Sequence, residues 1–439
     1  MRTLALLFAF SAPVFANWST EGTYLRDSSG RVAVFRGLNV SASMKVPPFT
    51  SGFRASDLDP LPKWGINAIR LLFIWEAAEP KEGVYDRPYL TWYKNVVKEA
   101  AKRGIYVLVD IHQDAYSRFA TDGCGAGFPD WTVAAPLKKP DNSDACAPWG
   151  LKELTDAQTK ESFRSLYAPG SKVRARFLKM AETLVELLND CPKVLGYDLN
   201  EPWGDWDSDL LPLYADMAGI LQKKDPQKIL FLEPSLGRIS IAPGLTVSPN
   251  LTRPTFDHFI LAPHYYDIQT LIFGKRFVDF TRSEVGKIQK QASKWNVPWA
   301  IGEFGVEPIE AQYAEWDRHF VSNFQWSYTP DWTPEARDHW NAEDTHILDS
   351  EGKFRRFRVK PFAERIAGMP KTAGESGGGY SLTWDNDPSQ GTTVLFVPSS
   401  PEIQTSPPEL RCRYVQNGQR VECSSPLAGT HTVRIRSKS

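Results

Sequence analysis

Short β-rich runs alternate with amphipathic stretches of helical periodicity from residue 17 to about residue 366. The runs read as strands are residues 35–40, 68–73, 106–111, 194–199, 229–232, 259–263, 299–301 and 323–326. The main helical patterns between them cover residues 89–101, 172–188, 210–224, 278–295 and 310–320. Eight strand-then-helix units in about 350 residues predict an α/β chain folded as a (β/α)8 TIM barrel with insertions.

A doubly wound open sheet is the alternative for such an alternating pattern. That fold usually carries a glycine-rich phosphate-binding loop directly after its first strand. The segment Arg36-Gly37-Leu38-Asn39 at this position is not such a loop. The barrel is therefore the favoured architecture.

The alternation stops at a glycine-rich segment, residues 374–379. Regular short strand patterns with turn signals follow, which is typical of a small β-sandwich. These patterns cover residues 380–384, 392–397, 410–415, 421–423 and 430–436. We therefore predict a catalytic barrel over residues 17–366 and a C-terminal β-sandwich over residues 367–439 that packs against it.

The first 16 residues have the pattern of a signal peptide. One basic residue, Arg2, precedes an apolar run, and small residues lead to Ala16. The run is too short for a permanent membrane anchor, and no later stretch of about 18 apolar residues occurs. Residues 1–16 are thus expected to be removed from a secreted or periplasmic protein.

Composition narrows the class of protein further. The 51 Lys and Arg residues nearly balance the 52 Asp and Glu residues, and 42% of the chain is hydrophobic. This balance argues against a nucleic-acid-binding protein, which normally shows a basic excess or a basic stripe. Nothing in the pattern implies an obligate protein partner.

Five cysteines in an exported chain predict two disulfides and one remaining thiol. Asn417-Gly418 is a strong two-residue hairpin signal and lies midway between Cys412 and Cys423. These two cysteines should face each other across the hairpin, within bridging distance. Cys124 is expected to pair with Cys146, leaving Cys191 as a buried or free thiol.

Polar residues that directly follow barrel strands are the candidates for chemistry, because TIM-barrel active sites lie at the carboxyl ends of the strands. The set contains two glutamates and is rich in neutral donors and aromatic faces, which suits two-carboxylate glycoside hydrolysis. Its members are Asn39, Arg70, His112, Asp114, Asn200, Glu201, His264, Tyr266, Glu303 and Trp326.

The two glutamates receive different roles. Glu201 is the candidate general acid, because burial beside Trp203 and a carboxylate neighbour would keep it protonated near neutral pH. Glu303 is the candidate nucleophile, and Arg70 is the cation that could keep it ionised. Asn200 could hydrogen-bond the 2-hydroxyl of the sugar. This chemistry needs neither a metal nor an organic cofactor.

The ordered motifs resemble those of glycoside hydrolase family 5. They are Arg36-Gly37-Leu38-Asn39, residues 64–70, Asn200-Glu201-Pro202, His264-Tyr265-Tyr266 and Gly302-Glu303-Phe304-Gly305. Residues 110–114, Lys45 and the segments 359–362 and 367–370 are similar to the endoglycoceramidase and glucosylceramidase branch.

That resemblance implies Glu201 as acid/base and Glu303 as nucleophile, about 5 to 5.5 Å apart, in a retaining β-glycosidase acting on glycolipids. It also implies a sugar-binding shell made of Lys45, His112, Asp114, Asn200, Tyr266 and Trp326. A glycolipid substrate would involve peripheral contact with membranes or micelles.

Other interpretations remain open at this level. His112 and Asp114 have the spacing of a metal pair completed by a distant histidine such as His264, although that chemistry normally occurs on an all-β fold. Trp326 could pack in the core instead of against a pyranose ring. The function could also be that of a secreted β-glucanase or mannanase, or of a catalytically silent carbohydrate-binding barrel.

Two long insertions could shape the pocket beyond the sugar. Residues 116–171 contain Trp131 and Trp149, and residues 267–277 contain the apolar side chains Ile268, Leu271, Ile272 and Phe273. Loops of this length in compact domains are usually functional. They could line a slot for a lipid aglycone or simply pack against the barrel.

Overall fold

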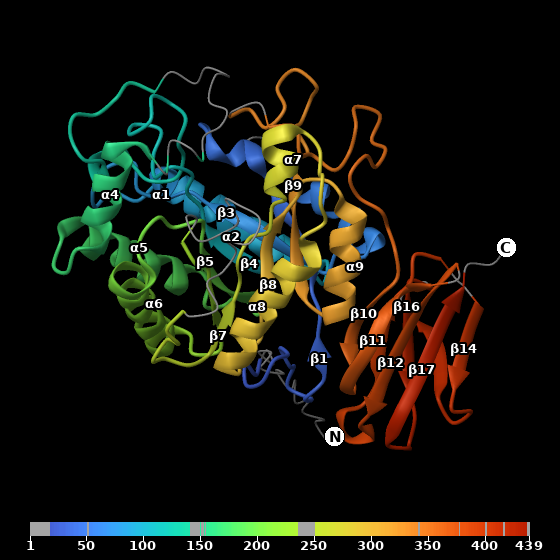
Figure 1. Ribbon diagram of the computed structural model, residues 1–439. Helices are drawn as coiled ribbons and strands as arrows, with labels where there is room; N and C mark the ends of the chain where they lie inside the picture. Colours follow the sequence, from blue (N-terminus) through green and yellow to red (C-terminus); the bar gives the residue numbers. More distant parts are fainter. Residues whose placement is uncertain are drawn as a thin grey trace, which may run out of the picture.

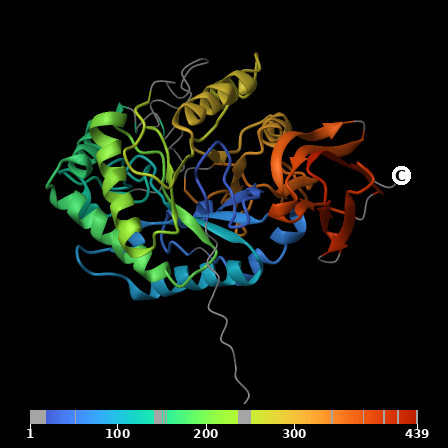
Figure 2. The same cartoon turned by 90° about the horizontal axis from the view of Figure 1, so that it is seen from below.

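The computed structural model describes residues 18–436 apart from 51, 141–149, 151–152, 154, 236–250, 341–342, 377, 400–401 and 416–417. The predicted signal peptide, Cys146 and Trp149 lie outside the described residues. The described chain forms a barrel and a β-sandwich that lie side by side (Figures 1 and 2). Within the described part of the chain, no helix is long and apolar enough to cross a membrane.

The barrel is an eight-stranded parallel sheet in the order β7-β6-β5-β4-β3-β2-β9-β8. A parallel bridge between Leu261 and Trp299 joins its two ends, which excludes the open doubly wound sheet. The strands are β2 (Arg36–Val40), β3 (Ala68–Phe73), β4 (Tyr106–Ile111), β5 (Val194–Leu199), β6 (Ile229–Leu232), β7 (Phe259–Leu261), β8 (Ala300–Phe304) and β9 (Ser322–Tyr328). The predicted (β/α)8 barrel is thus confirmed, and β3 to β6 have the predicted bounds. The strand predicted at 299–301 continues through Glu303, so this residue lies inside β8.

The helices surround the barrel in Figure 2. They are α1 (Trp75–Ala78), α2 (Arg87–Lys102), α4 (Ala157–Tyr167), α5 (Lys172–Leu188), α6 (Leu211–Lys224), α7 (Ile268–Phe273), α8 (Thr281–Trp295) and α9 (Ile309–His319). Side-chain caps begin several of them: Asp86 accepts from the Tyr89 N–H, and Ser171 accepts from the Arg174 N–H. In α5 the buried residues Phe177, Ala181, Leu184 and Leu188 recur every three or four positions, so a single face packs on the sheet.

The sandwich consists of two antiparallel sheets, ordered β1-β10-β13-β16-β15 and β11-β12-β17-β14. Its strands are β1 (Val32–Ala33), β10 (Phe362–Ile366), β11 (Gly368–Ser376), β12 (Gly379–Asn386), β13 (Thr393–Phe396), β14 (Glu402–Ser406), β15 (Arg411–Val415), β16 (Arg420–Ser424) and β17 (Gly429–Arg436). β1 and β10 come from the chain before residue 367. The glycine-rich segment 374–379 forms the end of β11 and its turn into β12, because Ser376 pairs with Gly379.

The sandwich packs directly on the barrel. The Phe396 ring of β13 lies so close to Gly65 that a Cβ there would be 2.6 Å from the ring, and Gly65 also has φ +83°. Arg36 of β2 pairs with Asp317 of α9 at 2.5 Å and lies over the Phe362 ring of β10. The barrel and the sandwich therefore share a buried interface.

Four of the five cysteines lie in the described part of the chain. Cys412 and Cys423 pair across β15 and β16 and form a disulfide with a Cα–Cα distance of 4.1 Å, as predicted. Cys191 is a buried free thiol, also as predicted. Cys124 is disulfide-bonded, but Cys146 lies outside the described residues, so that pairing stays a prediction.

Candidate active site

Arg70 of β3 lies at the centre of a buried charged cluster inside the barrel. Its Nε is 2.9 Å from a carboxylate oxygen of Asp198 on β5, and its Nη1 is 3.0 Å from one of Asp110 on β4. The same Nη1 is 2.6 Å from Glu303 Oε1 on β8. Arg70 and both aspartates are fully buried. One guanidinium thus joins acidic groups from three strands, because the inward-facing positions of parallel strands meet inside a barrel.

Glu303 accepts hydrogen bonds at both carboxylate oxygens. Arg70 donates to Oε1, and the Tyr266 hydroxyl donates to Oε2 at 2.8 Å. Donors of this kind stabilise the ionised form of a carboxyl group. The pairing with Arg70 is the one expected from the sequence, and Tyr266 adds a second donor.

Glu201 follows β5 in a very different environment. It is 4% exposed, and its backbone has φ +39°. Burial, assisted by the negative charge of Asp114, raises the pKa of Glu201 to about 8. A carboxylate neighbour therefore exists as predicted, whereas the Trp203 ring packs against Phe163.

His264 connects the two glutamates. Its Nδ1 is 2.8 Å from Glu201 Oε1 and 3.5 Å from Glu303 Oε2. Burial lowers the pKa of His264 to about 3, so the ring is neutral at physiological pH. A proton on Nδ1 would donate to Glu201 Oε1 and would leave Oε2 to carry the acidic proton. One oxygen of Glu201, one of Glu303 and a ring nitrogen of His264 lie within 4.8 Å of one another.

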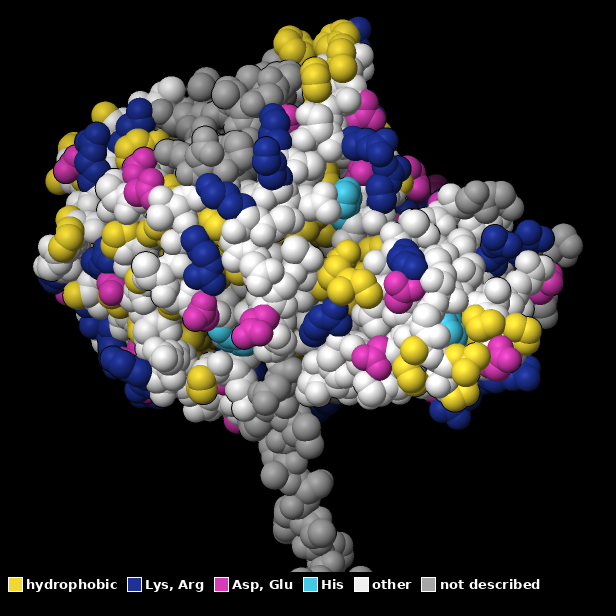
Figure 3. Space-filling model, turned by 60° about the horizontal axis from the view of Figure 1, so that its bottom comes forward, with side chains coloured by type: hydrophobic (Ala, Val, Ile, Leu, Met, Phe, Trp, Pro, Cys, Tyr) yellow, Lys and Arg dark blue, Asp and Glu magenta, His cyan; other side chains and the backbone are white. Residues whose placement is uncertain are grey.

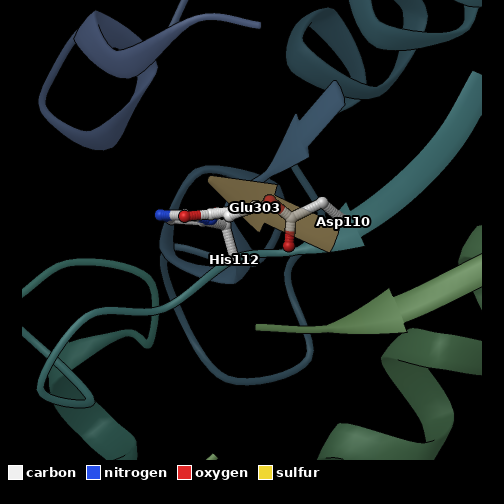
Figure 4. A group of neighbouring side chains, drawn as sticks. All are labelled: Asp110, His112 and Glu303. Carbon is white, nitrogen blue, oxygen red and sulfur yellow. The ribbon is translucent and has the colours of Figure 1, made fainter. Parts of the chain in front are cut away.

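Lys45, His112 and Asp114 form a second buried network at the barrel mouth. Lys45 Nζ is 2.8 Å from Asp114 Oδ2, and His112 Nε2 is 3.1 Å from the same oxygen. The other ring nitrogen of His112 is 2.7 Å from Asp110. Burial opposes charge on His112, but Asp110 and Asp114 outweigh it and raise the pKa of His112 to about 9. Figure 4 shows Asp110 and His112 from β4 and its end, together with Glu303 from β8.

Trp326 and Asn200 border these networks. The Trp326 ring stacks on His112 with an interplanar angle of 5°, and Lys45 Nζ lies 4.3 Å from the ring centroid. Asn200 accepts from Arg70 at 2.8 Å and donates to the Gln113 carbonyl at 2.7 Å. The structure thus brings the predicted sugar-binding residues together around Glu201 and Glu303.

The alternative metal site at His112, Asp114 and His264 is not formed. The three clusters of potential ligand atoms among the described residues do not combine these three side chains. Both nitrogens of His112 contact carboxylates, and Asp114 pairs with Lys45. These residues have the arrangement of an ion-pair network.

Sequence reasoning missed several buried acidic groups of the site. Asp110 and Asp198 lie within predicted strands, where only the tertiary fold shows which side chains point inward. Glu233, fully buried, directly follows β6, so the rule applied to the other strand ends could have found it. Gln113, from a motif noted only for resemblance, donates to the carbonyls of Asn200 and Glu201.

The two insertions differ in their packing. Trp131 donates its indole N–H to the Glu79 carbonyl and lies against Trp75, so its ring packs the loop onto the barrel. The insertion at residues 267–277 contains α7, whose last residue, Phe273, is 62% exposed. The side chains of Ile268, Leu271 and Ile272 lie outside the described set.

Together, the barrel and its paired carboxyl groups have the arrangement of glycoside hydrolases. The model of cellulase, glycosyl hydrolase family 5, matches residues 27–331. The chain therefore belongs to glycosyl hydrolase family 5.

Named relatives agree with this assignment, and a solved structure shares the fold. An endoglycoceramidase of Hydra vulgaris is 28% identical over 65% of this chain and 64% of its own length. Endoglycoceramidase I of Rhodococcus hoagii is 26% identical over 80% of this chain and 73% of its own. The structure of endo-glycoceramidase II from Rhodococcus sp. with ganglioside GM3 has a TM-score of 0.77 and 21% identity, covering 95% of this chain and all of that chain. The chain thus spans about two thirds of the length of the first of these relatives.

Proposed function

We propose that this protein is a retaining β-glycosidase that hydrolyses the sugar–lipid bond of glycolipids such as glucosylceramide or an oligoglycosylceramide. The observation that carries the proposal is the spacing of the two carboxyl groups. One oxygen of Glu201 lies within 4.8 Å of one oxygen of Glu303. An inverting enzyme separates its carboxyls by about 6.5 to 9.5 Å to seat a water molecule between them.

The first chemical step follows from the surroundings of each group. Glu303 attacks the anomeric carbon and forms a glycosyl ester, while Glu201 donates its proton to the departing oxygen. A Glu201 pKa of about 8 keeps that proton in place at neutral pH. Tyr266 and Arg70 hold the two oxygens of Glu303 and thereby orient the nucleophile.

The second step reverses the roles. Glu201, now ionised, takes a proton from a water molecule that attacks the glycosyl ester, and Glu303 leaves as a carboxylate. Arg70 stabilises the charge that returns to Glu303. A catalytically silent barrel would need neither the elevated pKa of Glu201 nor the ion-paired Glu303.

The lipid aglycone is supported by the named relatives and is tested by the substrate profile. We expect kcat/KM for alkyl β-glucosides, kept below micelle formation, to rise as the alkyl chain lengthens, because each buried CH₂ contributes about 0.8 kcal/mol. Glucosylceramide and longer glycosphingolipids should be hydrolysed, with the Glu303→Gln variant as the inactive control. Equal rates on methyl and dodecyl glucosides, together with faster cleavage of cellulose or mannan oligomers, would favour the polysaccharidase alternative.

The same proposal includes membrane contact by a tip that consists of the end of α7 and the residues that follow it, residues 273–278. Phe273, Phe277 and Val278 are 62%, 60% and 52% exposed, and the two phenyl rings lie 5.7 Å apart. Lys275 lies between the two phenylalanines in the sequence, so apolar insertion is combined with attraction of one lysine to anionic headgroups, whereas Arg276 pairs with Asp279 at 2.8 Å. Hydrophobic side chains gather at the tip of the projection at the top of Figure 3.

The position of this tip fits a glycolipid substrate. α7 begins two residues after Tyr266, which binds Glu303, and stands above the barrel in Figure 1. Contact of the tip with a bilayer would therefore turn the barrel mouth toward lipid headgroups.

Binding of an inactive variant to vesicles tests the membrane contact of the tip without hydrolysis of any substrate. The Glu303→Gln protein should cosediment with vesicles of phosphatidylcholine and phosphatidylserine. Adding Phe273→Asp and Phe277→Asp should reduce binding at least tenfold, whereas adding Leu427→Asp, at an exposed site on the sandwich, should not. Unchanged binding in the double tip variant would contradict this contact.

We also propose that residues 1–16 direct export and are removed. The Cys412–Cys423 disulfide supports an oxidising destination. Terminal sequencing of protein recovered outside the cytoplasm should begin at Asn17. Recovery only in the cytoplasm with Met1 retained would contradict export.

A further inference from the structure

Glu233 lies behind the acid/base residue and has no role in the chemical steps described above. It follows β6 and is fully buried. Its Oε2 accepts the backbone N–H of Glu201 at 2.8 Å, and its own carbonyl accepts the Tyr214 hydroxyl from α6 at 2.8 Å. The Glu233 side chain is therefore anchored to the segment that carries Glu201.

The backbone of Glu201 needs such an anchor. Its φ of +39° lies in the left-handed region, which non-glycine residues adopt at an energetic cost unless their surroundings hold them there. Gln113 Nε2 donates to the Glu201 carbonyl at 2.9 Å, while Glu233 holds the N–H on the other side of the same residue. Together the two side chains fix the direction in which the Glu201 carboxyl points.

The charged groups around Glu233 determine its protonation state. The titratable groups that face it are Asp198 from β5, Glu201, His264, Arg70 from β3 and Tyr214 from α6. One oxygen each of Glu233 and Asp198 lies within 4.8 Å of a His264 nitrogen, and Glu233 Oε1 is 3.2 Å from His264 Nδ1. Arg70, the one permanent cation in this group, already pairs with Asp198 and Glu303. Burial, followed by Asp198 and Glu201, raises the pKa of Glu233 well above its ordinary value.

We propose that Glu233 is a positioning residue for the acid/base Glu201: as a neutral carboxylic acid, it holds the left-handed backbone of Glu201 without adding a second negative charge beside it. The inference rests on the proposed function, because it assigns Glu233 to the proton-transfer side of that reaction. A neutral acceptor suffices for this role, so glutamine should replace Glu233 and leucine should not.

Leaving-group dependence provides the test. In Glu233→Leu, kcat/KM for an alkyl β-glucoside should fall about 100-fold, because misplacing a general acid forfeits much of its contribution. For 2,4-dinitrophenyl β-glucoside, whose leaving group needs no proton, kcat/KM should fall less than fivefold. Glu233→Gln should recover the alkyl substrate to within about threefold of wild type.

The pH profile tests the charge of Glu233 separately. The alkaline limb of kcat/KM should stay within about 0.3 pH unit in Glu233→Gln, because one neutral group replaces another. If Glu233 were ionised, the substitution would remove a negative neighbour, lower the Glu201 pKa and move the limb down by a unit or more.

Glu284→Leu, a buried glutamate of α8 outside the site, is the matched control and should leave both substrates unaffected. Equal losses on both substrates in Glu233→Leu, failure of glutamine to restore activity, or the downward shift of the limb would each overturn the inference. If Glu233→Leu does not fold, the glutamine variant and its pH profile still decide. A wild-type protein that cleaves no β-glucoside would instead contradict the proposed function.

Discussion

Glu201 and Glu303 lie close together in one barrel, yet their side chains have different partners. Glu303 lies in a strand and receives a guanidinium and a phenol at its two oxygens. Glu201 follows a strand, where burial and Asp114 raise its pKa to about 8 while a neutral His264 contacts one oxygen. Two residues of one type thus lie in different electrostatic surroundings, because neighbouring strands place different groups beside them.

The strongest test of the nucleophile side is Glu303→Gln. We expect kcat on an aryl β-glucoside to fall about 10⁴-fold or more, because an amide cannot form the glycosyl ester. Arg70 keeps Asp110 and Asp198 as partners, so the variant should fold. Less than a tenfold loss, with an unchanged thermal midpoint, would show that another group is the nucleophile.

Replacing the proposed general acid, Glu201, should have an effect that depends on the leaving group of the substrate. Glu201→Ala should lower kcat/KM for alkyl β-glucosides by about 10² to 10⁴-fold and affect 2,4-dinitrophenyl β-glucoside much less. Azide should restore turnover of the activated substrate and yield the β-glycosyl azide, detected by NMR. An α-glycosyl azide, or an α-anomer as the first product of the wild type, would exclude retention.

The pH dependence of activity should report the protonation state of Glu201. The acid must be protonated, so kcat/KM for an alkyl β-glucoside should decline as pH rises through about 8, by about tenfold per unit above that value. The folded protein keeps this proton above the usual glutamate range. The contribution of Glu201 to the free energy of unfolding should therefore fall as pH rises from about 4.5 to 8. A profile flat to pH 10 would contradict the protonated state of Glu201.

The smallest expected effect concerns orientation of the nucleophile. Tyr266→Phe removes the donor to Glu303 Oε2 and should lower kcat about tenfold, the value of one hydrogen bond to a charged group. Tyr265→Phe is the matched control, because the adjacent hydroxyl bonds Thr281 instead. Equal losses of kcat in the two variants would contradict a specific role for the Tyr266 hydroxyl.

Much of the architecture follows from local pattern. β3 to β6 have the bounds predicted from their apolar runs, because continuous burial leaves a clear signal along the chain. The sandwich was harder to delimit. β1 pairs with β10 across more than 300 residues, and a two-residue strand carries almost no signal of its own.

The candidate site, too, could be predicted only in part from the sequence. The positions of Glu201, Glu303 and Arg70 could be found from the sequence because strand ends and the inner face of a barrel are places where polar residues are unusual. Glu233 obeys the same rule, but nothing in the chain says that its carboxyl meets the backbone N–H of Glu201. The pairing of Lys45 with Asp114 likewise joins two segments about 70 residues apart.

The sequence by itself therefore determined the class of fold, the two candidate carboxyl groups, the Cys412–Cys423 pairing and the resemblance that named the family. Only the tertiary structure decided which of the buried acids are paired with cations and which retain protons. At the site, burial raises the pKa values of Glu201 and Glu233. The physical reason is that the protonation state of a buried carboxyl depends on desolvation and on charges a few ångströms away, and both are set by contacts between strands distant in the chain.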